Sequence, residues 1–200
     1  MIRPQLSPED QALIESLYAQ RVLHEAKLDC DLSHTLVVTD LANLHPDISF
    51  HTQVPPAHII CVSTGGCSLH NITSDADHEE CRAHTMILIR SALQMKPINE
   101  IALVSAPSLN PGCSFVDTID QLRSAEAFVR ETFGKSRQIH NFICFQLSDD
   151  RKYTMQVNTP EFHAWYNKYE RDVLGRDDRA LEDDSEPDAG IDGRSGMTIP

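Results

Sequence analysis

Residues 58–105 read HIICVSTGGCSLHNITSDADHEECRAHTMILIRSALQMKPINEIALVS, and this stretch decides the fold. Two short apolar runs, HIICVS at 58–63 and INEIALVS at 98–105, have the continuous hydrophobicity of strands buried on both faces. Between them, apolar residues recur at helical spacing over 77–95 until Pro97 ends the pattern. A strand, a helix and a strand in this order predict a crossover unit with two parallel strands.

The segment before this unit adds elements of both kinds. The β-branched run HTLVVTDL at 34–41 predicts a strand, and the alternating run at 48–54 predicts a short edge strand. Earlier still, Ser7 followed by Pro8 has the pattern of a helix cap and first helical residue. Apolar residues at helical spacing then predict a helix to about Leu28.

The segment after the unit continues the alternation and then changes. Ser114, with Asp117 three residues later, predicts a capped helix that Gly134 ends. The runs at 139–147 and 153–157 are typical of strands, and the five residues between them favour a hairpin.

The resulting fold class is α/β, with a mostly parallel three-layer sheet, helices on both faces, and a C-terminal β-hairpin and helix. The last helix begins near Pro160 and ends at Gly175. We therefore expect a single domain over 1–175. Residues 176–200, rich in Asp and poor in aromatics, cannot bury enough apolar surface to fold alone, so we expect an acidic disordered tail.

The charge of the chain limits its partners. The net charge is −13, of which the tail carries −5 and residues 1–175 carry −8. Such a body repels nucleic-acid backbones and anionic lipids, which favour clusters of Lys and Arg. No apolar run approaches the roughly 20 residues that a membrane span needs. We expect a protein partner or a homo-oligomer, with no nucleic-acid backbone and no membrane as partner.

The cysteines and the N-terminus indicate a compartment. The sequence begins without the basic and apolar segments of a secretory signal. Of the six cysteines, Cys61 and Cys144 lie inside apolar runs, where a thiol behaves as a small core residue. Three disulfides are the alternative by number alone. We expect an intracellular, reducing location, the cytoplasm.

A cluster of cysteine and histidine residues follows the strand at 58–63. Pairs separated by two residues can bind one metal ion, because both side chains can point inward at a turn or helix start. The spacing matches no zinc module, and the alternative is loop histidines beside cysteines that pack a helix. If these side chains converge, they form a tetrahedral zinc site from Cys67, His70, Cys81 and either His84 or His78.

The ends of the predicted parallel strands are the second candidate site. Ligands of open α/β sheets bind beyond the carboxyl ends of the strands. Paired glycines there can turn backbone N–H groups toward an anion, although they also occur in plain turns. The candidate ligand-binding residues are Asp40, Thr64, Gly65, Gly66 and Ser108.

Two classes of function remain open. The first is a non-catalytic assembly or regulatory protein that binds a protein partner through an acidic surface and the tail. The second is a small-ligand-binding or metal-assisted hydrolytic enzyme whose site lies at the carboxyl ends of the parallel strands. The absence of a recognised catalytic motif, the acidity and the tail favour the first. Aromatic residues on the last helix would add a partner-binding face if they do not pack on the sheet: Trp165, Tyr166 and Tyr169.

Overall fold

The fold is described from a computed structural model of the chain. The structure describes residues 6–23, 34–40, 58–62, 69, 76–105, 113–134, 136–146 and 152–175. Its contacts divide the chain into two compact units, Met1–His163 and Ala164–Pro200, which are treated separately below. The expected domain boundary after residue 175 stays a prediction, since the tail lies outside the described residues.

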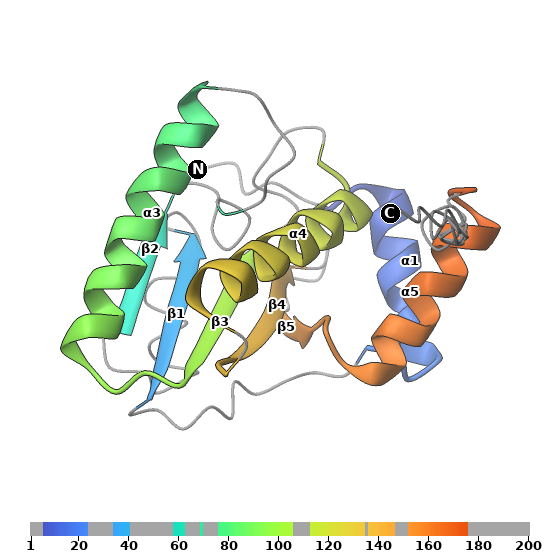
Figure 1. The fold of residues 1–200 in the computed structure, drawn as a ribbon. Helices are drawn as coiled ribbons and strands as arrows, with labels where there is room; N and C mark the ends of the chain where they lie inside the picture. Colours follow the sequence, from blue (N-terminus) through green and yellow to red (C-terminus); the bar gives the residue numbers. More distant parts are fainter. Residues whose placement is uncertain are drawn as a thin grey trace, which may run out of the picture. The chain divides into compact units, whose positions relative to one another are not determined.

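The first unit contains a mixed sheet of five strands (Figure 1). Their order is β2-β1-β3-β4-β5, and the first four strands are parallel. The mostly parallel α/β sheet expected from the sequence is confirmed in this form. The strands are β1 (Thr35–Asp40), β2 (Ile59–Val62), β3 (Glu100–Ser105), β4 (Gln138–Gln146) and β5 (Lys152–Gln156).

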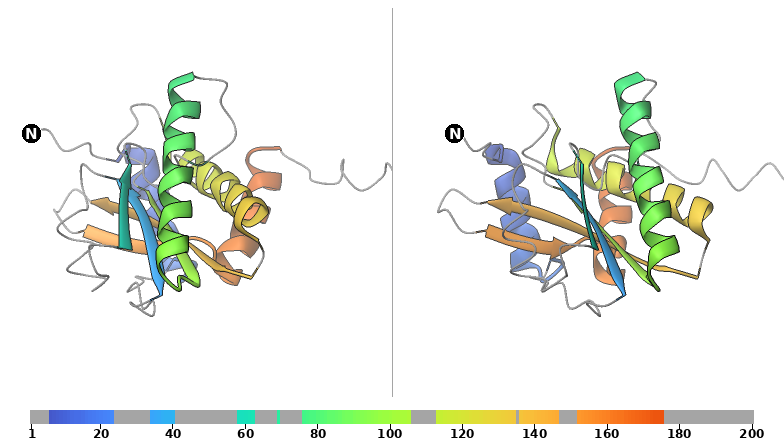
Figure 2. Two further views of the ribbon diagram at one scale, coloured as in Figure 1. Left: turned by 60° about the vertical axis from the view of Figure 1, so that its left-hand side comes forward. Right: turned by 90° about the vertical axis from the view of Figure 1, so that its left-hand side faces the viewer.

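Two long helices cross over one face of this sheet (Figures 1 and 2). Helix α3 (Ala76–Met95) connects β2 to β3, and α4 (Phe115–Phe133) connects β3 to β4. α3 packs beside the edge strand β2, whereas α4 packs over β3 and β4. The first turns of α3 extend beyond the carboxyl ends of the strands in both figures.

The last strand runs against the other four. β5 pairs with β4 in antiparallel register, with Ile143 opposite Met155. Of the residues expected to join the hairpin, 148–151 lie outside the described residues and Lys152 begins β5. Residues 48–54, expected to form an edge strand, also lie outside the described residues. The hairpin and the edge strand therefore stay predictions.

Both ends of α4 form as its sequence predicts. The Ser114 hydroxyl accepts the amide of Asp117 at 3.1 Å, and the Asp117 carboxylate accepts the amide of Ser114 at 2.9 Å. This reciprocal pair is a capping box, which satisfies amides that the helix itself leaves unpaired. At the other end Gly134 has a φ of 89°, a conformation that glycine adopts without a side-chain clash.

Helix α1 (Pro8–Ala19) is shorter than its sequence predicts. The expected helix to Leu28 is wrong, because Arg21 takes a φ of 58° and the amides of Arg21 and Val22 bond back to Tyr18 and Leu17. These two bonds form a Schellman motif, which ends a helix and usually has glycine at the position of Arg21. Because the sequence has no glycine there, it contains no recognisable signal for the end of the helix.

Helix α5 (Pro160–Asp172) crosses the boundary between the two units. In the second unit, the Trp165 ring stacks on Tyr169 with centroids 5.1 Å apart and meets Tyr166 edge-on at 5.9 Å. Tyr166 is buried and the other two rings are half-buried. The three aromatics therefore contact one another, which is compatible with either expected role. None of the described helices is long and apolar enough to cross a membrane.

Candidate functional site

The strand order creates a switch point between β1 and β3. The chain leaves β1 for β2 on one side and later returns to β3 on the other side of β1. At such a point the connections diverge in opposite directions and leave a crevice beyond the strand ends, where ligands of open α/β sheets bind. Asp40 ends β1 and Ser105 ends β3, so both residues stand at this place.

The structure describes only part of the ligand site predicted from the sequence. Asp40 is the last residue of β1, and its register partner in β2 is Val62. Ser105 is buried. Thr64, Gly65, Gly66 and Ser108 lie outside the described residues. Their grouping with Asp40 stays a prediction.

Thr39 precedes Asp40 at the end of β1, at the switch point, and was not among the ligand-binding residues predicted from the sequence. Its side chain is fully buried, and within the described part of the chain its hydroxyl oxygen has no hydrogen-bond partner. A buried hydroxyl without a partner costs roughly 1–3 kcal/mol, so such groups are unusual away from water or ligand sites. The sequence places Thr39 at the end of a strand, but a threonine in a β-branched run is typical of any strand, so its burial could not be predicted.

The start of α4, which follows β3 in the chain, is acidic and contacts α1. The buried carboxylate of Asp10, from α1, accepts the amide of Phe115 at 3.0 Å. Asp117 accepts the amide and the hydroxyl of Ser114 at 2.9 and 2.7 Å. Two carboxylates of the protein itself therefore hold the helix end, where an anionic ligand would otherwise be attracted.

This acidic surrounding also affects Cys113, which precedes the helix. Burial raises the pKa of the Cys113 thiol, and the nearby carboxylates of Asp117 and Asp10 add to the increase. The thiol lies 3.6 Å from the hydroxyl of Thr118. Since the thiolate is the reactive form, Cys113 is a poor nucleophile at neutral pH.

The predicted zinc ligands are described only on α3. Cys81 is half-buried and His84 is exposed, and residues three apart on a helix lie on adjacent faces. That spacing lets both side chains approach one ion. Cys67 and His70 lie outside the described residues, and within the described part no three His, Cys, Asp or Glu side chains are grouped to hold a metal ion. The zinc site stays a prediction.

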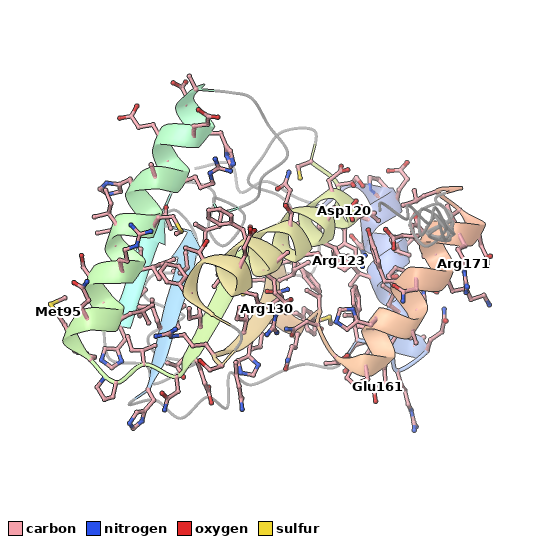
Figure 3. All side chains as sticks on the ribbon, viewed as in Figure 1. Met95, Asp120, Arg123, Arg130, Glu161 and Arg171 are labelled. Atoms are coloured by element: carbon pink, nitrogen blue, oxygen red, sulfur yellow. The ribbon has the colours of Figure 1, made fainter. Side chains whose placement is uncertain are left out.

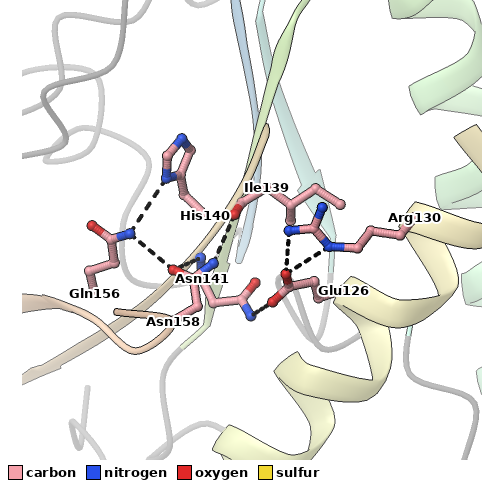
Figure 4. Close-up of polar contacts among 7 residues, drawn as sticks. All are labelled: Glu126, Arg130, Ile139, His140, Asn141, Gln156 and Asn158. Carbon is pink, nitrogen blue, oxygen red and sulfur yellow. Dashed lines mark hydrogen bonds and ion pairs between the residues drawn. The ribbon is translucent and has the colours of Figure 1, made fainter. Parts of the chain in front are cut away.

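A polar network between α4, β4 and the end of β5 was not predicted (Figure 4). The side-chain amide nitrogen of Asn141, a fully buried residue, donates a hydrogen bond to a carboxylate oxygen of Glu126 at 2.6 Å. The other carboxylate oxygen of Glu126 accepts from two nitrogens of Arg130 at 2.9 and 2.7 Å. Charge-assisted bonds of this kind are about twice as strong as neutral ones, so the network ties α4 to the sheet.

Asn158 completes the network beyond β5. Its side-chain oxygen accepts a hydrogen bond from the backbone amide of Asn141 at 3.2 Å, and its side-chain nitrogen donates one to the Ile139 carbonyl at 2.8 Å. Gln156 donates to the same oxygen of Asn158 at 3.0 Å and lies 3.5 Å from His140. These contacts fix the end of β5 against β4. The network therefore has a structural role, because it joins α4, β4 and the chain after β5.

Comparison with protein families, curated protein sequences and solved structures finds no match to this chain.

Proposed function

We propose that this protein is a non-catalytic assembly or regulatory protein that binds a protein partner through its acidic surface and tail. The observation that carries the proposal is the sign of the exposed charges in the first unit. Its described exposed cations are Arg21 and Arg90. Its described exposed carboxylates are Glu9, Glu15, Asp77, Glu79, Glu80, Asp117, Glu131 and Glu161.

A predominantly acidic surface selects basic partners and accelerates their encounter. The residues after Gly175 extend this charge, with Glu182, Asp183, Asp184 and Glu186 close together in sequence. The acidic tail therefore adds attraction for the same basic partner. Each exposed ion pair contributes only about 0.2–1 kcal/mol, so the binding depends on several carboxylates acting together.

The test is quantitative co-purification of the tagged full chain from its native source, at about 50 mM and about 300 mM salt. The test variant neutralises the four tail carboxylates to Gln or Asn. A second test variant neutralises four carboxylates of the acidic surface, Glu9, Glu15, Glu131 and Glu161, and should also lower recovery of the partner. We expect a stoichiometric partner at low salt, recovered roughly tenfold less with the tail variant and at high salt. A partner retained equally by the tail variant and at both salt concentrations contradicts the proposal.

The switch point favours a second candidate, a ligand-binding or metal-assisted hydrolytic enzyme. The strand order and the unpartnered hydroxyl of Thr39 support it.

Metal analysis of the protein purified without added metal tests the hydrolytic form of this candidate. About one zinc per chain that is lost in Cys67→Ser and Cys81→Ser supports the zinc site. Metal-free protein of unchanged stability rejects it.

The three-layer arrangement and the reducing intracellular location belong to the same proposal. The consecutive residues Leu36, Val37 and Val38 are all fully buried, and successive residues of a strand point to opposite faces. Burial on both faces supports helices or chain on both sides of the sheet. The buried thiol of Cys144, 3.2 Å from the hydroxyl of Thr154, supports a core role for that cysteine.

A further inference from the structure

Helix α3 buries little of its length in its own chain. Of its 20 residues only Thr85, Met86 and Ile89 are buried. Its outer face carries Ile87, which is 60% exposed, and Met95, which is 75% exposed. Figure 3 shows the Met95 side chain on the side of α3 that faces away from the sheet.

The outer face has a regular pattern. Six residues spaced alternately four and three apart are all exposed, and this spacing places them along one line of the helix. The contact residues of two-helix coiled coils have the same spacing, and there they are mostly apolar. We call this line of the helix the α3 seam, and its members are Ala76, Glu80, Ala83, Ile87, Arg90 and Gln94.

The α3 seam is complementary to itself when two copies run antiparallel. Aligning Glu80 with Arg90 of the second copy also aligns Ala83 with Ile87 of the second copy, since both pairs share one midpoint. By two-fold symmetry each contact occurs twice. Ile87 then packs against a small side chain that allows close approach, and each acid meets a base.

We propose that two copies of this chain form a two-fold dimer through the α3 seam, with the two α3 helices antiparallel. A second copy of the chain fits this surface because Glu80 of each copy meets Arg90 of the other. Within the described residues, neither Glu80 nor Arg90 has an ion-pair partner. A parallel arrangement would set Glu80 near Glu80 and Arg90 near Arg90, which is repulsive. The antiparallel arrangement also aligns the two helix dipoles favourably.

The dimer is expected to be weak. One helix pair buries less surface than the roughly 1,200–2,000 Å² of standard stable interfaces. Two chains of net charge −13 also repel each other, and salt screens that repulsion. The inference goes beyond the proposed function, because it requires no other protein and is tested without one.

Sedimentation velocity of the purified full chain between about 1 and about 300 µM tests the proposal. We expect a reversible monomer–dimer equilibrium. Ile87→Glu should raise the dimer dissociation constant at least about tenfold, because it places a carboxylate in the contact. Val173→Glu is the matched control, since Val173 is 62% exposed and lies outside α3, and it should leave the constant unchanged.

Charge reversal tests the antiparallel register. Glu80→Arg and Arg90→Glu should each weaken the dimer roughly tenfold, whereas the double variant Glu80→Arg/Arg90→Glu should return to within about threefold of the original constant. Circular dichroism confirms that each variant is folded. A monomer at every concentration overturns the proposal. Equal effects of Ile87→Glu and Val173→Glu, or failure of the double variant to recover, overturn it as well.

Discussion

Helices α3 and α4 lie on the same face of one sheet and have nearly equal lengths, yet they use their surfaces differently. α4 buries six residues over its 19, has a capping box at its start, and is bonded to the sheet through Glu126 and Asn141. α3 buries three residues over its 20 and exposes Ile87. The comparison shows that α4 packs mainly within its own chain, whereas α3 has an exposed face, the α3 seam, for contact with a second copy.

The largest expected difference is between two isoleucines. Ile119 of α4 is fully buried and Ile87 of α3 is 60% exposed. Ile119→Ala should lower the free energy of unfolding by about 2–5 kcal/mol, since it removes buried methylene groups and leaves a cavity. Ile87→Ala, measured at about 1 µM where dimer is scarce, should change it by less than about 0.5 kcal/mol. Urea unfolding measures both, and equal losses would remove the distinction between the helices.

A smaller difference is expected between two glutamates. Glu126→Ala should lower the free energy of unfolding by about 2–3 kcal/mol, because the buried side-chain amide nitrogen of Asn141 loses the carboxylate that accepts its hydrogen bond. Glu79→Ala on the exposed first turn of α3 should cost at most about 1 kcal/mol, the value of a favourable charge at a helix start. Urea unfolding of the two variants checks this. A loss of less than 1 kcal/mol in Glu126→Ala would show that the network of Figure 4 contributes little.

Two serines give the next comparison. Ser114→Ala should destabilise by about 1 kcal/mol, because the amide of Asp117 loses its acceptor. Ser91 is exposed on α3, where its hydroxyl donates a hydrogen bond to the Ile87 carbonyl one turn earlier. Ser91→Ala should be neutral or slightly stabilising, since alanine is the better helix former. A Ser91→Ala variant that loses as much as Ser114→Ala contradicts the assignment of the cap.

The smallest effect concerns the reactivity of Cys113. Its raised pKa leaves little thiolate at neutral pH, so alkylation by iodoacetamide should keep rising with pH beyond the range of an ordinary cysteine. Asp117→Asn removes one of the carboxylates that raise this pKa, and should increase the rate at neutral pH roughly twofold to threefold. Peptide mass spectrometry follows the modification. A rate that levels off near neutral pH would show that the pKa is not raised.

Much of the fold was predictable from local sequence. The buried run at 98–105 and the cap at Ser114 were each recognisable alone, since periodicity and capping act within a few residues. The run at 58–63 forms a strand as predicted, but β2 lies at the edge of the described sheet and its Ile59 and Ile60 are half-buried, so the expected burial on both faces is wrong there. The end of α1 was not recognisable, because Arg21 takes the conformation usually given to glycine. The strand order was also not predictable. Parallel pairing follows from crossover helices, but the side of β1 on which β2 lies depends on contacts distant in sequence.

The candidate site was less predictable than the fold. Glu126, Asn141 and Asn158 come from three elements, and each alone is an ordinary helix, strand or loop residue. Their meeting depends on the register between β4 and the chain after β5, which no local pattern encodes. Most of the predicted ligands lie outside the described residues, so their roles stay predictions. These residues are Thr64, Gly65, Gly66, Cys67, His70 and Ser108.

Hydrogen exchange of the full chain at two protein concentrations tests the contrast between the helices most directly. At about 1 µM, amides of α4 should exchange only through global unfolding, whereas amides of α3 should exchange faster through local opening. At about 300 µM, protection should rise over residues 80–94 of α3 and stay unchanged in α4, because a dimer stabilises only what it contacts. Equal protection of the two helices at low concentration, with no change in α3 at high concentration, would contradict the account.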